Sequence, residues 1–262
     1  MENTNWLRQT AEKPLFEDLI WSRPENKRQA GKLLIIGGNA HGFAAPVAAY
    51  NAAQTAGIGS ARVILPESLR KTVGPAFTET DFAPHTPNGS FAKRALDMIL
   101  DGAGWADSVL LAGDFGRNSE TAVLLSSFME KCAGHITVAQ DSLDYFLDVN
   151  SPLMSRPETL AVINMGKLQK LGKTNHPQPP VRHAMNLMDL VKLLNGWRAE
   201  IITMHSEHYV ASFGGKTSTT PVRDKQNWQA ELAAYAAVWR LQNPKKPLEA
   251  LTTAIYDYMI SV

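Results

Sequence analysis

The sequence contains almost no cysteine and no long apolar stretch, and both absences narrow the classes of protein it can belong to. Cys132 is the only cysteine among 262 residues, which excludes a disulfide framework and a thiolate metal site. No segment has the apolar length that a transmembrane helix or a secretory signal needs, so we expect a cytoplasmic protein. The formal net charge is +1 without a basic block, so neither nucleic acid nor a membrane surface is an expected partner.

Hydrophobic residues make up 44% of the chain and charged residues 19%, which is typical of a globular domain with a sizeable core. We interpret residues 23–262 as one domain, because no linker-like composition divides them. Residues 1–22 are interpreted as an N-terminal helical extension, because residues 15–21 are amphipathic. Such a helix would pack on the outside of the domain or against another subunit.

Residues 31–66 have the pattern of a strand, a glycine turn, a helix and a second strand. Residues 33–36 form an unbroken apolar run, as in a strand that a parallel sheet buries on both faces. Residues 44–56 are rich in alanine, which suits a helix packed closely on that sheet, and residues 61–65 begin the next strand. A right-handed βαβ unit of this kind binds its ligand at the carboxyl ends of the strands.

The motifs around the first strand decide between two families. A Rossmann unit would have Gly-x-Gly-x-x-Gly, but the chain has GGNAHG at 37–42 with a different spacing. The segments KRQAGK at 27–32 and AAP at 44–46 resemble Lys-Gly-x-x-Gly-Lys and Gly-Ala-Pro of the ADP/ATP-dependent NAD(P)H-hydrate dehydratases. The resemblance runs from about Arg23 to the C-terminus and implies a ribokinase-like three-layer α/β/α sandwich with a mostly parallel central sheet. It also implies that Ala45 borders the substrate.

A second glycine turn follows the apolar strand at residues 108–112. In the family this turn is Gly-Pro-Gly-Leu-Gly, whose bare backbone faces the substrate, so the resemblance assigns Gly116 to substrate binding. Asp114 replaces one of the glycines and adds negative charge where a phosphate would lie. The alternative is an ordinary turn before a helix, with Ser119 as the N-cap.

Two further turns resemble the family in framework more than in chemical groups. Asp141 follows the strand at residues 135–139 and matches the second acid of Asp-Ala-Asp-Ala-Leu; alternatively, it is a helix N-cap. Residues 160–172 match Thr-Pro-His-x-Gly-Glu-Phe-x-x-Leu, with Asn164 at the His and Lys167 at the Glu. The resemblance places Asn164 beside the substrate, whereas an ammonium at Lys167 cannot act as a general base or bind magnesium.

A β-hairpin is predicted after the strand at residues 200–204. Its strands would be residues 209–213 and 216–220 around two glycines. The segment MHSEHYV at 204–210 resembles the family's Leu-Lys-Gly-Ala-x-Thr-Val, in which the Lys-Gly pair borders the adenine nucleotide. The resemblance therefore assigns His205 and Ser206 to nucleotide binding.

Histidines are the remaining candidates for metal binding. His205 and His208 are three residues apart, and on one extended strand their side chains would point to opposite faces. The proline-rich loop at residues 173–183 carries two histidines, but no carboxylate or third ligand is near in sequence. We therefore expect no metal site in the protein itself.

The segment WQAE at 228–231 stands where the family has Gly-Thr-Gly-Asp. There the glycine amides hold the transferred phosphate and the Asp accepts the proton of the substrate hydroxyl. The resemblance assigns Glu231 as the catalytic base and places Asn227 and Trp228 beside the nucleotide, although Trp228 adds bulk where the phosphate would lie. The alternative for Glu231 is a first-turn acid that complements the helix dipole.

Outside these motifs the sequence predicts helices and one long loop. Residues 72–90 have no periodicity and are interpreted as a loop beside the site or a subunit contact. Apolar spacing predicts helices at residues 91–100, 184–194 and 248–259.

The resemblance implies that the chain is an NAD(P)H-hydrate dehydratase-like protein, a carbon–oxygen lyase. Such an enzyme uses ATP or ADP, with Mg²⁺, to phosphorylate the hydroxyl of hydrated NAD(P)H and then eliminates phosphate. The lost glycines keep two alternatives open: a catalytically silent member that binds a nucleotide or metabolite, and a small-molecule kinase acting on a vitamin or sugar. The implied partner is a nucleotide or dinucleotide, and the implied assembly is a homo-oligomer, a tetramer in the family.

Overall fold

The computed structural model describes residues 5–74, 77, 79–175, 179–222 and 228–261. The strands are β1 (Trp6–Arg8), β2 (Lys32–Gly37), β3 (Ser60–Pro66), β4 (Thr80–Ala83), β5 (Ser108–Gly113), β6 (His135–Ala139), β7 (Thr159–Val162), β8 (Glu200–His205), β9 (His208–Phe213) and β10 (Lys216–Pro221). The α-helices are α1 (Glu17–Trp21), α2 (Ala44–Thr55), α3 (Leu96–Trp105), α4 (Ser119–Lys131), α5 (Pro152–Ser155), α6 (Met165–Asn175), α7 (Leu187–Asn195), α8 (Trp228–Gln242) and α9 (Pro247–Ile260). The 3₁₀ segments are η1 (Glu67–Leu69), η2 (Lys93–Ala95) and η3 (Gln140–Phe146).

The described strands form a single sheet in the order β1-β10-β9-β8-β7-β6-β5-β2-β3-β4. All neighbours from β8 to β4 are parallel, and β8, β9 and β10 form antiparallel pairs. The βαβ unit predicted around residues 31–66 is confirmed as β2, α2 and β3. The hairpin predicted after residue 204 is confirmed as β9 and β10.

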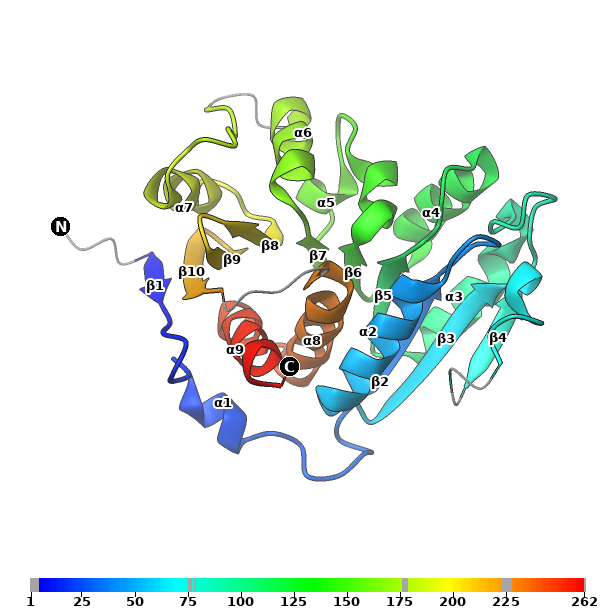
Figure 1. The fold of residues 1–262 in the computed structure, drawn as a ribbon, viewed down its shortest axis with the longest axis horizontal. Helices are drawn as coiled ribbons and strands as arrows, with labels where there is room; N and C mark the ends of the chain where they lie inside the picture. Colours follow the sequence, from blue (N-terminus) through cyan, green and yellow to red (C-terminus); the bar gives the residue numbers. More distant parts are fainter. Residues whose placement is uncertain (1–4, 75–76, 78, 176–178, 223–227, 262) are drawn as a thin grey trace.

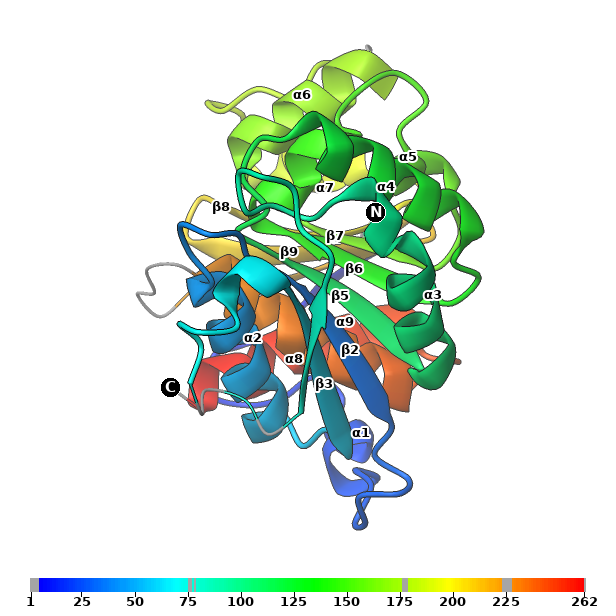
Figure 2. The ribbon, with the colours of Figure 1, turned by 90° about the vertical axis from the view of Figure 1, so that its right-hand side faces the viewer.

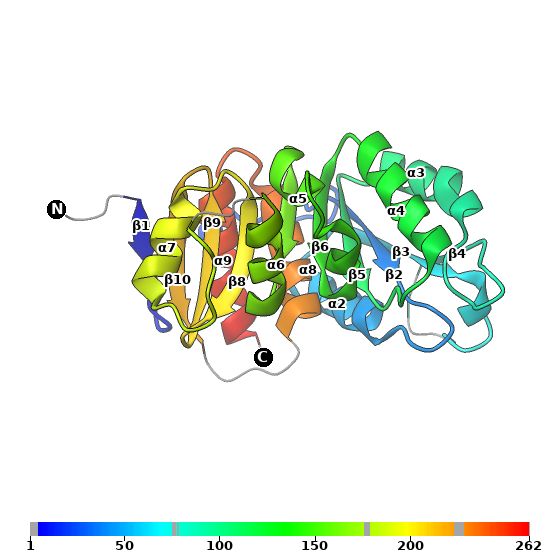
Figure 3. The same cartoon turned by 90° about the horizontal axis from the view of Figure 1, so that it is seen from above.

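Helices cover both faces of this sheet, so the predicted three-layer α/β/α sandwich is confirmed (Figures 1, 2 and 3). Figure 1 shows α2, α8 and α9 on one side and α4, α6 and α7 on the other. Leu33 and Ile35 belong to the core beneath α2 and α8, whereas Leu34 and Ile36 belong to the core on the opposite face. The alternation follows from the two-residue period of a strand, and it explains why the whole run is apolar.

Two edge strands, β1 and β4, lie in segments that the sequence predicted to be a helical extension and a loop. The segment at residues 72–90 contains β4, and the expected N-terminal helical extension contains β1, which pairs in parallel with β10. Both strands are short and mostly half-buried, so neither carries the apolar run that identifies an inner strand. The helix expected at residues 91–100 begins later, as η2 followed by α3.

Among the described helices, none combines the length and the apolar character that crossing a lipid bilayer requires.

Candidate functional site

The glycine turn after β2 lies against the turn after β5. Gly38 N donates to Gly113 O at 2.9 Å. A Cβ atom on Gly37 would lie 2.4 Å from Gly113 O, and Gly38 has a φ of +87°. These two positions therefore require glycine, and the turn predicted from the sequence brings two neighbouring loops into backbone contact.

Asp114 joins the turn after β5 to the start of α2. Its carboxylate accepts the backbone N–H of Ala45 at 2.7 Å, and its carbonyl oxygen accepts the side-chain amide of Asn39 at 2.6 Å. The N-cap residue of α2, Phe43, provides no capping side chain, so Asp114 supplies the acceptor and negative charge that stabilise this helix end. The Ala45 amide, expected beside the substrate, is bound by an acid of the chain itself.

Asp141 binds the same turn from the neighbouring strand. Its carboxylate accepts the N–H groups of Phe115 at 3.3 Å and Gly116 at 2.9 Å. Burial raises the pKa of Asp141, and the two N–H groups act in the opposite direction. The residue lies inside η3, so the N-cap alternative for Asp141 is wrong. The N-cap expected at Ser119 is also displaced by one residue, because Asn118 caps α4.

The turn after β7 holds Asn164 and Lys167. The side-chain oxygen of Asn164 accepts Lys167 N at 3.0 Å and caps α6. The ammonium of Lys167 donates to Gln140 O at 2.6 Å and pairs with Asp144 at 3.0 Å. Lys167 therefore ties α6 to the segment after β6, which is a structural use of the position that holds a carboxylate in the resembled family.

Four of the residues expected from the resemblance line one cavity. This cavity, which we call the β8–α8 pocket, has a volume of about 780 Å³. It contains Asn164, His205, Ser206 and Trp228, together with His183, which the sequence offered only as a metal candidate. The residues that the sequence did not identify are Met165, Gly166, Met204, Glu207 and Val222. The adjacency of Gly166 to Asn164 was a usable signal, whereas Met204, Glu207 and Val222 reach the pocket only because of the hairpin. Asn227 lies outside the described residues.

The remaining expected residues lie elsewhere along the same edge of the sheet. Gly116 lines two other cavities, and Ala45 and Glu231 line none of the cavities described here. The structure therefore places Asn164, His205, Ser206 and Trp228 around one cavity, whose lining does not include Ala45 or Gly116, and Glu231 follows Trp228 by three residues on α8.

His205 and His208 face each other across a tight turn, so the expectation that they occupy one extended strand is wrong. His205 ends β8 and His208 begins β9, and the two residues pair in register. Ser206 and Glu207 between them have φ values of 47° and 58°, as a two-residue type I′ hairpin requires. His205 Nε2 lies 2.6 Å from Met185 O, so the imidazole is hydrogen-bonded to the backbone.

No group of three or more His, Cys, Asp and Glu with the geometry of a metal site occurs among the described residues. His183 is exposed in the part of its loop that the structure describes, and His176 lies outside that part.

The N-terminus of α8 is built from aromatic side chains. Trp228 is only 7% exposed, and its ring lies 5.5 Å from the ring of Tyr209 in an edge-to-face contact. The carboxylate of Glu231 is half-buried and accepts the Tyr258 hydroxyl of α9 at 3.1 Å. Burial, followed by the nearby Tyr209 and Glu231, raises the pKa of Tyr258 well above its usual range, so the phenol remains a donor.

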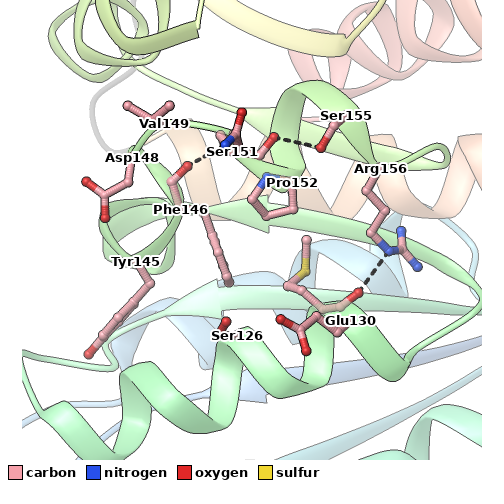
Figure 4. Close-up of a pocket in the computed structure, with 12 residues that line it drawn as sticks. Ser126, Glu130, Tyr145, Phe146, Asp148, Val149, Ser151, Pro152, Ser155 and Arg156 are labelled. Carbon is pink, nitrogen blue, oxygen red and sulfur yellow. Dashed lines mark hydrogen bonds between the residues drawn. The ribbon is translucent and has the colours of Figure 1, made fainter.

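A further cavity of about 500 Å³ lies between α4 and the segment from η3 to α5 (Figure 4). It contains none of the residues expected from the sequence. Arg156 at its rim donates to the carbonyl oxygens of Met129 at 3.2 Å, Cys132 at 2.5 Å and Gly134 at 2.6 Å. The Arg156 guanidinium is therefore bound by the backbone, and it joins α4 to the start of β7.

No protein-family model and no curated protein sequence matches this chain. Solved structures match it along almost its whole length. A ribokinase-like superfamily protein from Enterococcus faecalis has a TM-score of 0.74 at 14% identity, covering 99% of this chain and 88% of its own. A hypothetical protein from Streptococcus mutans has a TM-score of 0.72 at 16% identity, covering 94% and 87%.

An ADP/ATP-dependent NAD(P)H-hydrate dehydratase from Bacillus subtilis, co-crystallised with ATP and Mg²⁺, has a TM-score of 0.66 at 13% identity. The match covers 95% of this chain and 88% of the dehydratase. At such identities a structural likeness establishes the fold and leaves the activity open. The sheet order, the layers and these matches agree: the chain has the ribokinase-like fold.

Proposed function

We propose that this chain binds a nucleotide or a nucleotide-like metabolite in the β8–α8 pocket and does not transfer its phosphate. The volume of about 780 Å³ is within the range of sites for ligands of this size. Met204 and Val222 supply apolar surface for a flat heterocycle, and the Asn164 side chain supplies polar contacts.

The single observation behind this proposal is the position of Trp228. The resemblance places the first glycine of the phosphate-holding Gly-Thr-Gly-Asp at this residue. An indole that is 7% exposed and packed on Tyr209 occupies the space that bare backbone would leave for an anion. Phosphoryl transfer depends on positioning and charge stabilisation, so a filled cradle removes the main source of rate acceleration.

The charged groups at the positions of the family motifs have other partners in the chain. Lys167 is bound by Gln140 and Asp144, and Asp114 is bound by the N-terminus of α2. Glu231 accepts a hydrogen bond from Tyr258, which is not the environment of a free base. Among the described residues no group of three or more His, Cys, Asp and Glu side chains could hold a metal ion, and we assign no step to Mg²⁺.

The alternatives are an NAD(P)H-hydrate dehydratase and a small-molecule kinase. Both need the phosphate cradle and a base at Glu231, and both therefore predict turnover with ATP or ADP. Binding without turnover separates our proposal from these two enzymes.

Thermal unfolding with ATP, ADP, AMP, NADH and hydrated NADH tests the proposal, with NADH formation followed in parallel. We expect saturable stabilisation by at least one of these compounds and no turnover. Gly166→Leu should abolish the stabilisation, because Gly166 lines the pocket and a leucine side chain there would occupy the space of the ligand. The fold should tolerate the change, because a Cβ at Gly166 contacts only the Asn164 side chain, at 3.5 Å.

Gly104→Leu is the matched control, because it adds the same side chain to α3 with nothing within 4 Å of its Cβ. Turnover of hydrated NADH would establish the dehydratase instead. Absence of any shift, or equal shifts in both leucine variants, would contradict a ligand in the β8–α8 pocket.

We also propose a homo-oligomer that covers the exposed apolar side chains near the chain ends. Trp21 is 85% exposed and Ile260 is 54% exposed, on helices α1 and α9 that contact each other.

Sedimentation velocity should give the mass of an oligomer for the full chain and a smaller mass for Trp21→Ser. Val123→Ser, at a residue that is 54% exposed on α4, is the control that should keep the larger mass. A monomer at all concentrations would contradict this assembly.

A further inference from the structure

A second cavity lies where the strand order reverses. From β2 the chain proceeds to β3 and β4 on one side, and it then returns to β5 on the other side of β2 (Figure 1). The helices that follow β2 and β5 lie on opposite faces of the sheet (Figure 1), and the crevice at such a reversal of strand order is where open α/β sheets bind ligands. We call the cavity of about 570 Å³ found there the switch-point cavity. It is lined by residues 39–41, Ser68, His85, residues 87–90 and residues 116–118.

The switch-point cavity is separate from the β8–α8 pocket, because the two share no lining residue. Its ligand therefore does not depend on the function proposed above. The two cavities lie over opposite halves of the parallel sheet, one beside β2 to β5 and the other beside β7 and β8.

The walls of the switch-point cavity are held together by hydrogen bonds. Gly89 O accepts Ala40 N at 3.0 Å and the Ser68 hydroxyl at 2.8 Å. A Cβ on Gly89 would lie 2.3 Å from the Cβ of Ala40, so the loop at residues 87–90 can approach this closely only with glycine. The neighbouring residue Asn39 is bound to Asp114 O at 2.6 Å. The cavity is therefore formed before any ligand enters, which lowers the entropic cost of binding.

The charged and titratable side chains that line this cavity are all basic. They are His41, His85 and Arg117, and no Asp or Glu is among the lining residues that the structure describes. His85 Nδ1 donates to Thr86 O at 2.7 Å, which leaves Nε2 for a ligand. Arg117 is exposed, and within the described part of the chain no hydrogen bond or ion pair is formed by its guanidinium.

Two of the three acids in the cavity on the other side of Arg117 have partners of their own, and no ion pair joins the third, Asp148, to Arg117 among the described residues. Arg117 also borders a neighbouring cavity that contains Asp141, Asp144 and Asp148. Asp141 accepts two backbone N–H groups, and Asp144 pairs with Lys167 at 3.0 Å. Arg117 therefore keeps its planar fork of donors available, and that fork matches the paired oxygens of a carboxylate or phosphate.

We infer that the switch-point cavity binds a small organic anion, a carboxylate or a phosphate monoester, through Arg117. The anionic group lies against the Arg117 guanidinium, and the rest of the ligand extends towards His85 and the loop at residues 87–90. The polar lining at Ser68 and Asn88 suits a hydroxylated carbon skeleton.

Isothermal titration calorimetry of the full chain tests this inference with ribose 5-phosphate, citrate and uncharged ribose. We expect binding of the phosphate ester, of the carboxylate, or of both, and no binding of ribose. Arg117→Gln should weaken binding by about tenfold or more, since a hydrogen bond to a charged group contributes about 1.5–3 kcal/mol. Arg198→Gln makes the same charge change at an exposed residue before β8, at the opposite edge of the sheet, and should bind as the parent does.

Three results would overturn the inference: no binding of either anion, unchanged affinity in Arg117→Gln, or equal weakening in Arg198→Gln. Gly166→Leu separates this cavity from the β8–α8 pocket, because anion binding here should persist in a variant whose nucleotide response is lost. Loss of anion binding in Gly166→Leu would place the anion in the β8–α8 pocket and would also overturn the inference.

Discussion

At the scale of single residues, two aspartates occupy backbone donors that a ligand could otherwise use. Asp114 binds the amide of Ala45, and Asp141 binds the amides of Phe115 and Gly116. Asp114 has a φ of 59°, a left-handed conformation that costs a non-glycine residue about 1 kcal/mol and persists where the surrounding bonds require it. Asp114, which replaces a glycine of the resembled family, and Asp141, which matches an acid of that family, both fix these turns with groups of the chain itself.

The hydrogen bond between Tyr258 and Glu231 gives a prediction at this scale. In a double-mutant cycle of Tyr258→Phe and Glu231→Ala, urea unfolding should give a coupling energy of about 1–2 kcal/mol, because a half-buried carboxylate loses its phenol donor. Tyr256→Phe, which removes a hydroxyl that donates to the neutral carbonyl of Glu12 at 3.3 Å, should show no coupling to Glu231→Ala. A coupling energy of zero for Tyr258 would mean that Glu231 faces the crevice, as a catalytic base would.

At the scale of elements, an ion cluster fixes α8 to the amino ends of the strands. Glu200 of β8 is 4% exposed and accepts Arg240 Nη2 at 3.0 Å and His135 Nε2 at 3.3 Å. Burial alone would raise the pKa of Glu200, but the hydrogen bonds and charges of His135 and Arg240 lower it below its ordinary value of 4.5. The cluster therefore holds the C-terminal end of α8, and the N-terminus of the same helix borders the β8–α8 pocket.

Glu200→Gln should destabilise the fold by about 3 kcal/mol at pH 7, because it leaves Arg240 buried without a counter-charge. Because the pKa of Glu200 is lowered on folding, its contribution is present above pH 4.5 and is lost as the pH falls through the folded value. Urea unfolding at pH 7 and at lower pH should therefore show the difference between variant and parent shrinking in acid. Glu79→Gln, from an exposed pair with Arg62 at 3.5 Å, should cost less than about 1 kcal/mol. Equal effects for the two glutamines would contradict this assignment.

At the scale of the whole molecule, the N-terminal segment encloses α9 (Figure 1). β1 pairs with β10 at one edge of the sheet, and the chain then passes α9 before it enters β2 near the other edge. Asp18 pairs with Lys246 at 2.7 Å, and Arg23 pairs with Asp257 at 2.5 Å. Contacts between residues more than 200 positions apart thus close the sandwich around its last helix.

Gln9 is the buried residue at the centre of this enclosure. Its side chain donates to Thr220 and Thr252 and accepts Leu15 N, each at 3.0 Å. Gln9→Ala should lower the stability by about 2 kcal/mol, because buried partners lose their bonds, and the melting temperature by about 4–8 °C. Gln54→Ala, on the exposed side of α2, is the control that should leave the melting temperature within about 1 °C. A Gln9→Ala protein that melts with the parent would show that the N-terminal segment does not hold α9.

The inner strands and long helices could be predicted because burial on both faces leaves a local signal. The apolar run in β2 and the small residues of α2 are examples of such a signal. β1 and β4 could not be predicted, since each is short and pairs with one neighbour only. In the site, resemblance in short motifs assigned Asn164 to the substrate and His205 and Trp228 to the nucleotide. The hydrogen bond from Tyr258 to Glu231 joins two helices and has no local signature.

The sequence by itself determined the class of fold, because hydrophobic periodicity and glycine turns act over a few neighbouring residues. It also determined that the catalytic groups of the resembled family are changed. Only the tertiary structure decided what the replacing side chains do: Asp114 caps α2, Lys167 binds Gln140, Trp228 packs on Tyr209, and Arg117 keeps its donors free of the described residues. The physical reason is that a hydrogen bond or ion pair depends on distance in space, and distances between remote segments are fixed only when the whole sheet is assembled.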